Sequence, residues 1–150
     1  MDGPHLPRSE CVICELLSGD LPATFLHRDD RCAVLMDIQP VNPGHLLVVS
    51  NVHAPLLQDL DAETTAHLMR VAHRMTIALR QSGLRCEGVN LFLADGEAAL
   101  QEVPHVHLHV FPRYRGDGFG LRFGPHYAKQ SRAALEGSAE AVKRALARIS

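Results

Sequence analysis

The stretch that decides the fold is His105-Val106-His107-Leu108-His109-Val110-Phe111. Side chains alternate between the two faces of a β-strand, so as a strand it places three histidines on one face and aliphatic side chains on the other, with about 6.6 Å between neighbouring imidazoles. Imidazole titrates near neutral pH, so one ring can be a neutral nucleophile while its neighbour is cationic. We predict a strand that packs through one face and offers a nucleophile and phosphate-neutralising donors through the other.

Two other interpretations of this histidine row are a metal site and ordinary surface histidines, the last disfavoured by the strict alternation. Zinc takes four Cys or His ligands in a tetrahedral arrangement. Cys11 and Cys14, spaced as Cys-x-x-Cys, and one histidine of the row leave one position, for which His53 is the best candidate. A zinc hydrolase with the whole row as ligands is disfavoured, because these residues already complete the site. A redox role for the cysteines needs a thioredoxin-like βαβ context, which the sequence lacks.

Length and composition bound the class of protein. With 150 residues and 46% hydrophobic content, the chain can bury one sizeable core, so we predict a flexible N-terminal arm over 1–10 and a single domain over 11–150. The formal net charge of -2 argues against a nucleic-acid partner, because phosphate-backbone binders carry a basic excess. The chain lacks both a run of roughly 20 apolar residues and an N-terminal signal sequence, which predicts a cytoplasmic protein without a membrane contact.

Periodicity and turn residues predict an α+β fold with a largely antiparallel sheet. A short helix is expected over 11–18 and a long amphipathic helix over 61–82, with Asp61 as its N-cap. A C-terminal helix begins at about Ser131. Apolar or alternating runs at 32–36, 44–50, 89–93 and 105–111 predict strands. An unpaired sheet edge in so small a domain favours pairing with a second copy.

Several motifs, in this order along the chain, resemble the histidine triad (HIT) family, specifically its zinc-carrying branch of small, mostly bacterial proteins. The histidine row is its core, preceded by Asp-Gly-Glu-Ala-Ala-Leu-Gln at 95–101. Asp-Ile-Gln-Pro-Val-Asn-Pro-Gly-His at 37–45 resembles the second family signature, and Arg-Tyr-Arg-Gly-Asp-Gly-Phe-Gly at 113–120 resembles the tail of that branch. The resemblance implies a HIT-like fold with about five antiparallel strands, one long helix and a C-terminal helix, with the sheet continued across a homodimer.

The resemblance also implies a reaction and a set of site residues. His107 would attack the α-phosphorus of a nucleoside phosphoramidate or dinucleoside polyphosphate and form a covalent nucleotidyl-histidine. His109 and His45 would line the phosphate, and Gln101 would contact the phosphate or the leaving group. A purine nucleotide would bind through Asp37 at the ribose and through apolar residues around the base, namely Ile13, Leu16, Leu35 and Ile38. A structural zinc would be held by Cys11, Cys14, His53 and His105.

Three positions depart from the usual family pattern. Ala94 stands where relatives usually carry an amide, Leu100 where they carry glycine, and Glu102 where they often carry serine or threonine. Ala94 and Glu102 therefore motivate an alternative function, a nucleotide-binding adaptor protein that keeps the pocket but turns over little.

Overall fold

A computed structural model describes residues 10–149 of the chain. The predicted N-terminal arm therefore lies, apart from Glu10, outside the described residues. Contacts divide the chain into two compact units, Met1–Gly118 and Phe119–Ser150. The prediction of a single domain over 11–150 stays a prediction, and each unit is described by itself.

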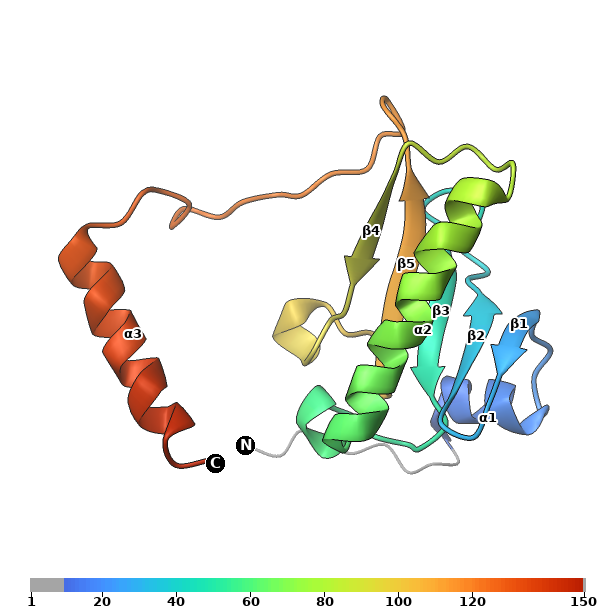
Figure 1. The fold of residues 1–150 in the computed structure, drawn as a ribbon, viewed down its shortest axis with the longest axis horizontal. Helices are drawn as coiled ribbons and strands as arrows, with labels where there is room; N and C mark the ends of the chain where they lie inside the picture. The colour runs from blue at the N-terminus through green and yellow to red at the C-terminus, as the bar shows by residue number, and fades with distance from the viewer. Residues whose placement is uncertain (1–9, 150) are drawn as a thin grey trace. The chain divides into compact units, whose positions relative to one another are not determined.

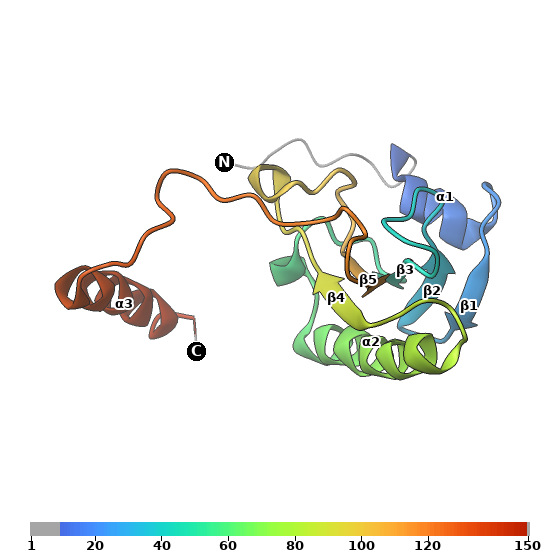
Figure 2. The ribbon, with the colours of Figure 1, turned by 90° about the horizontal axis from the view of Figure 1, so that it is seen from above.

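The first unit is an α+β layer structure, as predicted. Its helices are α1 (Val12–Ser18) and α2 (Ala62–Gln81), and its strands are β1 (Phe25–Arg28), β2 (Cys32–Met36), β3 (Leu46–Ser50), β4 (Gly88–Phe92) and β5 (His107–Arg113). The five strands form one antiparallel sheet in the order β1-β2-β3-β5-β4. Figure 2 shows α2 against one face of this sheet and α1 against the other.

The long helix α2 matches the prediction to within one residue at each end. Asp61 is its N-cap, and its Oδ1 accepts a 2.8 Å hydrogen bond from the Thr64 amide, which satisfies an amide that the helix itself leaves unpaired. Figure 1 shows α2 lying across the sheet. Its buried side chains pack on aliphatic residues of β2, β3 and β5. This cluster includes Val34, Val48, Leu68, Val71, Ala72, Leu79, Leu108 and Val110. Burial of this apolar surface fixes which face of β5 points away from α2.

The register between β3 and β5 shows which face of the sheet the histidines lie on. Leu108 pairs with Val48, while His107 pairs with Val49 and His109 with Leu47. Because neighbouring residues face opposite sides, the imidazoles of β5 lie on the side of the sheet that α1 covers. There a second, smaller cluster contains Cys11, Ile13, Ala33, Leu35 and Val49.

Two strand predictions need correction. Strand β1 was not predicted, and the strand containing the histidine row was predicted over 105–111 but runs over His107–Arg113. His105 lies in a turn, and its backbone amide donates a 2.8 Å hydrogen bond to the Val103 carbonyl. The preceding Pro104 cannot donate to a sheet, so regular pairing starts after it.

The connection that leads into β3 is held at both ends. Gly44 has φ +102°, a backbone conformation that favours glycine, and a Cβ there would also lie close to Leu84 Cδ1, at 3.0 Å. Asn42 donates from Nδ2 to the Pro112 carbonyl and to Asp117, both at 2.9 Å. Asp117 also receives two hydrogen bonds from Arg113, of 2.6 and 2.8 Å. These bonds tie the turn before β3 to the end of β5.

The second unit contains α3 (Arg132–Leu146), which agrees with the predicted C-terminal helix. Ser131 Oγ caps it by accepting from the Ala134 amide at 3.1 Å. Every residue of α3 is exposed, including the apolar Leu135, Val142 and Leu146. Among the described helices of both units, none has the length and apolar character needed to cross a membrane.

Candidate functional site

The centre of the candidate site is a group of three imidazoles from two adjacent strands. His107 and His109 lie on β5, with ring centroids 5.0 Å apart. His45 immediately precedes β3, and its ring centroid lies 5.1 Å from that of His109. The structure therefore brings together the three histidines to which the family resemblance gives roles at the phosphate.

His107 is held in one tautomer by the backbone. Its Nδ1 lies 2.6 Å from the carbonyl oxygen of His105, and a carbonyl only accepts, so Nδ1 carries the proton. In the neutral ring Nε2 is then a bare lone pair, which is the form a nucleophile needs. The side chain is 8% exposed, so the ring is largely shielded while it retains some access.

His109 is kept neutral by its surroundings. Burial, followed by the nearby His107 and His45, lowers its pKa to about 4, although Asp37 acts in the opposite direction. Burial likewise lowers the pKa of His45. Both rings are thus uncharged near pH 7 and act there as neutral hydrogen-bond donors and acceptors.

The predicted nucleotide-binding residues fall into two groups. Asp37 lies beside the histidines, with Oδ2 3.5 Å from His45 Nε2, and Ile38 is 97% exposed. Ile13 and Leu35 are buried in the smaller cluster, where Leu16 packs partly buried against them. Contact of these residues with a base stays a prediction.

Gln101 is hydrogen-bonded to the backbone through both ends of its amide group. Its Oε1 accepts from the Gly96 amide at 2.8 Å, and its Nε2 donates to the Pro55 carbonyl at 2.6 Å. Ala94 and Glu102 are near it in the sequence and depart from the usual family pattern. Ala94 is buried and Glu102 is exposed. A contact between Gln101 and substrate stays a prediction, and it can be added to these bonds, because the amide has a second lone pair on Oε1 and a second N–H on Nε2.

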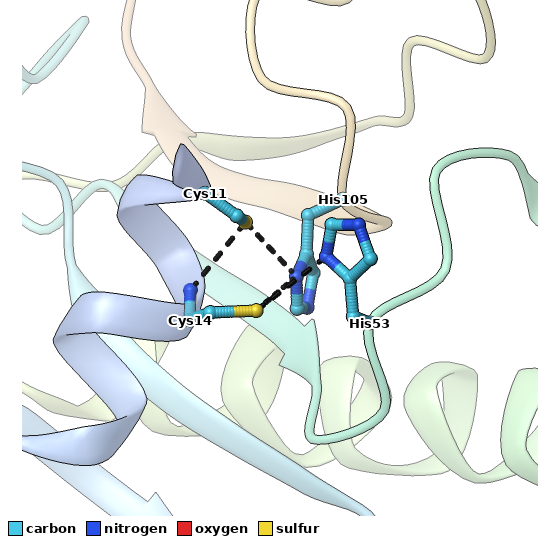
Figure 3. Close-up of side chains that lie close together, drawn as sticks. All are labelled: Cys11, Cys14, His53 and His105. Atoms are coloured by element: carbon cyan, nitrogen blue, oxygen red, sulfur yellow. Dashed lines mark hydrogen bonds between the residues drawn. The ribbon is translucent and has the colours of Figure 1, made fainter. Parts of the chain in front are cut away.

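A second group, which we call the Cys/His cluster, consists of Cys11, Cys14, His53 and His105 (Figure 3). Figure 3 shows the two cysteines at the start of α1 facing the two imidazoles. One donor atom from each residue lies within 4.8 Å of the other three. Cys11 Sγ and Cys14 Sγ lie 3.4 and 3.6 Å from His105 Nδ1, and Cys14 Sγ lies 3.4 Å from His53 Nδ1.

These distances suit a tetrahedral zinc. Zn–S and Zn–N bonds of about 2.3 and 2.0 Å at tetrahedral angles place sulfur and nitrogen about 3.5 Å apart. His105 Nε2 lies 2.7 Å from the Ser50 carbonyl and so carries the proton, which leaves Nδ1 with its lone pair toward the cysteines. The two thiols and two imidazoles thus form a complete zinc ligand set.

The structure also shows a histidine network that the sequence did not predict. Asp29 Oδ2 accepts from His27 Nε2 at 2.7 Å and from His67 Nε2 at 2.8 Å. In a tetrahedral zinc site oxygen and nitrogen ligands lie about 3.3 Å apart, so these shorter contacts are hydrogen bonds. Burial raises the pKa of Asp29, but the bonds from His27 and His67 outweigh it and hold the pKa below its usual value.

Comparison with known proteins identifies the family. The HIT domain family model matches residues 18–116. The chain belongs to the HIT family. A crystal structure of a zinc-bound histidine triad protein from Mycobacterium smegmatis has 40% sequence identity and a TM-score of 0.72, covering 79% of this chain and 86% of that one.

Two relatives show what is known of other members of the HIT family. An uncharacterised HIT-like protein of Borreliella burgdorferi is 33% identical over 116 residues, which is 77% of this chain and 84% of its own. Adenosine 5'-monophosphoramidase of Schizosaccharomyces pombe is 30% identical over 118 residues, which is 78% of this chain and 84% of its own. Named nucleotide hydrolases therefore occur among the HIT proteins that this chain resembles.

Proposed function

We propose that this HIT protein is a nucleotide hydrolase or transferase whose nucleophile is His107. The observation that carries the proposal is the 2.6 Å bond from His107 Nδ1 to the His105 carbonyl, since it leaves the Nε2 lone pair for attack at phosphorus. The monophosphoramidase activity named for the Schizosaccharomyces pombe relative supports a purine nucleoside phosphoramidate as substrate, and a dinucleoside polyphosphate is the other substrate that we propose.

The reaction would proceed in two displacements. His107 Nε2 attacks the α-phosphorus and forms a phosphorus–nitrogen bond, while the bond to the leaving amine or phosphate breaks. The leaving group departs with the electron pair, and a leaving amine also takes up a proton from solvent, which the water of the second step gives back. A water or another acceptor then attacks the same phosphorus, loses its proton, and displaces Nε2 to release the nucleotide. The neutral His109 beside it supports phosphate binding by hydrogen bonding.

A structural zinc is part of this proposal. The Cys/His cluster supplies the four ligands, and bound zinc would fix the ring of His105, whose carbonyl orients His107. The zinc-bound relative from Mycobacterium smegmatis supports this assignment. A closed four-ligand site has a structural role, because it keeps no position for substrate or water.

A homodimer and a cytoplasmic location are the remaining predictions. The dimer is supported by β4, an edge strand on which Leu91 and Phe92 are 40% and 38% exposed. An exposed apolar edge of this kind favours pairing with a second sheet.

Intact-protein mass spectrometry of the zinc-loaded chain mixed with adenosine phosphoramidate tests the reaction. We expect a transient mass increase of one adenylyl group, located on His107, which is absent from His107→Asn. Turnover by that variant should fall by about 10³-fold or more, as is usual on removal of a covalent nucleophile.

The adaptor alternative gives the opposite result in the same experiment. It is favoured by the exposed Glu102 and by the two hydrogen bonds that Gln101 makes to Gly96 and Pro55. If AMP binds but the wild type forms no adduct and no product, the enzyme proposal is wrong and the adaptor function stands.

A further inference from the structure

A buried ion pair lies at the end of β5. The side chain of Asp117 is 2% exposed, and its carboxylate accepts hydrogen bonds from Nε and Nη2 of Arg113 at 2.6 and 2.8 Å. Two parallel bonds from a planar guanidinium are among the strongest contacts that a carboxylate makes. Gly116, with φ +82°, provides the turn that brings Asp117 back to Arg113. A carboxylate enclosed to this degree is stable only while its partners stay in place.

The ion pair has a further partner in the β2–β3 connection, residues 37–45. Asn42 of this connection is 4% exposed, and its Nδ2 donates to Asp117 Oδ2 at 2.9 Å. Arg113 also donates from Nη1 to Asn90 Oδ1 of β4 at 2.7 Å. The ion pair therefore joins three segments that lie far apart in the sequence, namely the β2–β3 connection, β4 and the end of β5.

The β2–β3 connection also carries residues proposed to hold the nucleoside. Asp37 and Ile38 are at its start, and Ile38 is 97% exposed, so burial of its own side chain does not fix its position. The Asp37 amide donates to the His45 carbonyl at 3.0 Å and closes the connection into a loop. Further along this loop, the Asn42 carbonyl accepts from the His45 amide at 3.1 Å. The bond from Asn42 to Asp117 therefore anchors the same closed loop that would meet the nucleoside.

We propose that Asp117, held by Arg113, is a positioning residue that sets the affinity for the nucleoside by anchoring the β2–β3 connection through Asn42. This proposal rests on the proposed function for its nucleotide. It requires nucleotide binding but no turnover, so it applies equally to an enzyme and to an adaptor. It also gives a role to the aspartate of the 113–120 motif, to which the proposed function assigns none.

Two substitutions release the anchor in different ways. Asp117→Asn keeps the shape of the side chain but has one acceptor oxygen where the carboxylate has two, so at least one of the bonds from Arg113 and Asn42 is lost. Asn42→Ala removes the anchor and leaves the ion pair intact, so that no buried charge loses its partner. Both variants should loosen the β2–β3 connection while the strands on either side of it remain paired.

Amide hydrogen exchange of the zinc-loaded chain measures the local effect without substrate. The amides of Val41 and His45 are hydrogen-bonded within the connection, to His45 Nδ1 and to the Asn42 carbonyl. In Asp117→Asn and in Asn42→Ala we expect both amides to exchange about tenfold faster than in wild type, since one hydrogen bond to a charged group is lost. The amide of Val48, within β3, should keep its wild-type rate, which separates loosening of the connection from a general loss of stability.

Calorimetry with AMP measures the effect on the nucleoside. We expect Asp117→Asn and Asn42→Ala each to bind AMP about tenfold more weakly than wild type. Ile38→Ser should then weaken binding much less in either variant than in wild type, because a displaced connection no longer holds Ile38 against the base. Such non-additivity shows that the two positions are coupled. Glu87→Gln is the matched control, because Glu87 is an exposed acid at the same end of the sheet, and it should leave exchange, affinity and the Ile38→Ser effect unchanged.

Two outcomes overturn the proposal: exchange at Val41 and His45 that is unchanged in both variants, or an effect of Ile38→Ser that is the same in every background. If Asp117→Asn does not fold, Asn42→Ala decides both measurements. The proposed function fails separately. A chain that shows the coupling but forms no adduct with adenosine phosphoramidate supports the positioning role of Asp117 together with the adaptor function.

Discussion

The carbonyl oxygen of His105 lies 2.6 Å from Nδ1 of His107. One residue thereby serves two sites, since its ring belongs to the Cys/His cluster and its backbone fixes the tautomer of the proposed nucleophile. The turn at Pro104 makes this possible, because it frees the His105 ring to face α1 while the next residues join the sheet. A change in the position of His105 within the Cys/His cluster therefore also moves the carbonyl that holds His107.

Removal of zinc should strongly destabilise the folded chain. The apparent binding free energy of a structural zinc is about 10–16 kcal/mol. This is comparable with the free energy of unfolding of a whole domain, roughly 5–15 kcal/mol. We expect about one zinc per chain by elemental analysis, and a sharply lower melting temperature by circular dichroism after strong chelation or in Cys14→Ser.

Cys86→Ser is the control for the cysteine substitution. Cys86 lies outside the Cys/His cluster, and its Sγ donates to the Gly88 carbonyl at 3.3 Å, a bond that a hydroxyl can replace. This variant should retain zinc and its melting temperature. A chelator-treated wild type that contains no zinc and melts unchanged would remove the metal from the proposed function.

Acidification should weaken folding through His109. Its pKa in the folded chain is about 4 against an ordinary 6.5, so between these values the unfolded chain binds a proton that the folded chain excludes. The contribution is fully present above pH 6.5 and is lost as the pH falls toward 4. From pH 7.5 to 5 we expect wild type to lose about 2 kcal/mol more stability than His109→Gln.

Urea unfolding of both proteins at the two pH values measures this difference. Protonation of the Cys/His cluster occurs in both and cancels in the comparison. If wild type and His109→Gln lose equal stability between pH 7.5 and 5, His109 is not held neutral by its surroundings.

The fold was predictable where burial imposes a period on the sequence. Helix α2 and the strands β2, β3 and β5 have long or apolar patterns, and their predicted bounds lie close to the observed ones. Strand β1 is four residues at the sheet edge, alternately half-buried and exposed, and its Phe-Leu-His-Arg sequence has no strong strand pattern. The hydrogen bonds of Asp29 join residues from β1 and α2 that no local motif connects.

The candidate site was predictable in its residue types but not in its proton positions. Alternation placed His107 and His109 together, and Cys-x-x-Cys indicated the metal ligands. The tautomer of His107 depends on the His105 carbonyl, a backbone group of a kind present at every position of any sequence. Only its placement in three dimensions shows which imidazole nitrogen it contacts.

Ile38 should matter for nucleotide binding and not for folding. At 97% exposure it contributes little apolar burial to the folded chain, yet the prediction places it against the base. Burial of an isoleucine is worth roughly 1.5–3 kcal/mol, so Ile38→Ser should weaken AMP binding at least about tenfold by calorimetry, with stability changed by less than about 0.5 kcal/mol. Ile77→Ser, at an exposed position on α2, should leave the affinity unchanged, and equal affinities for all three proteins would exclude Ile38 from the base site.

Leu100→Gly should stabilise the chain. Leu100 has φ 71° and ψ 28° and is 77% exposed, so it bears the left-handed conformation without a packing gain. That conformation costs roughly 1–2 kcal/mol for a residue with a Cβ. Glycine removes this cost, but it also raises the conformational entropy of the unfolded chain, which offsets part of the gain. We expect a net gain of about 1 kcal/mol, seen as a melting temperature roughly 2–4 °C higher. The neighbouring Ala99→Gly, where φ is not positive, should lower stability, and a loss of stability in both variants would show that the Leu100 side chain has a structural role.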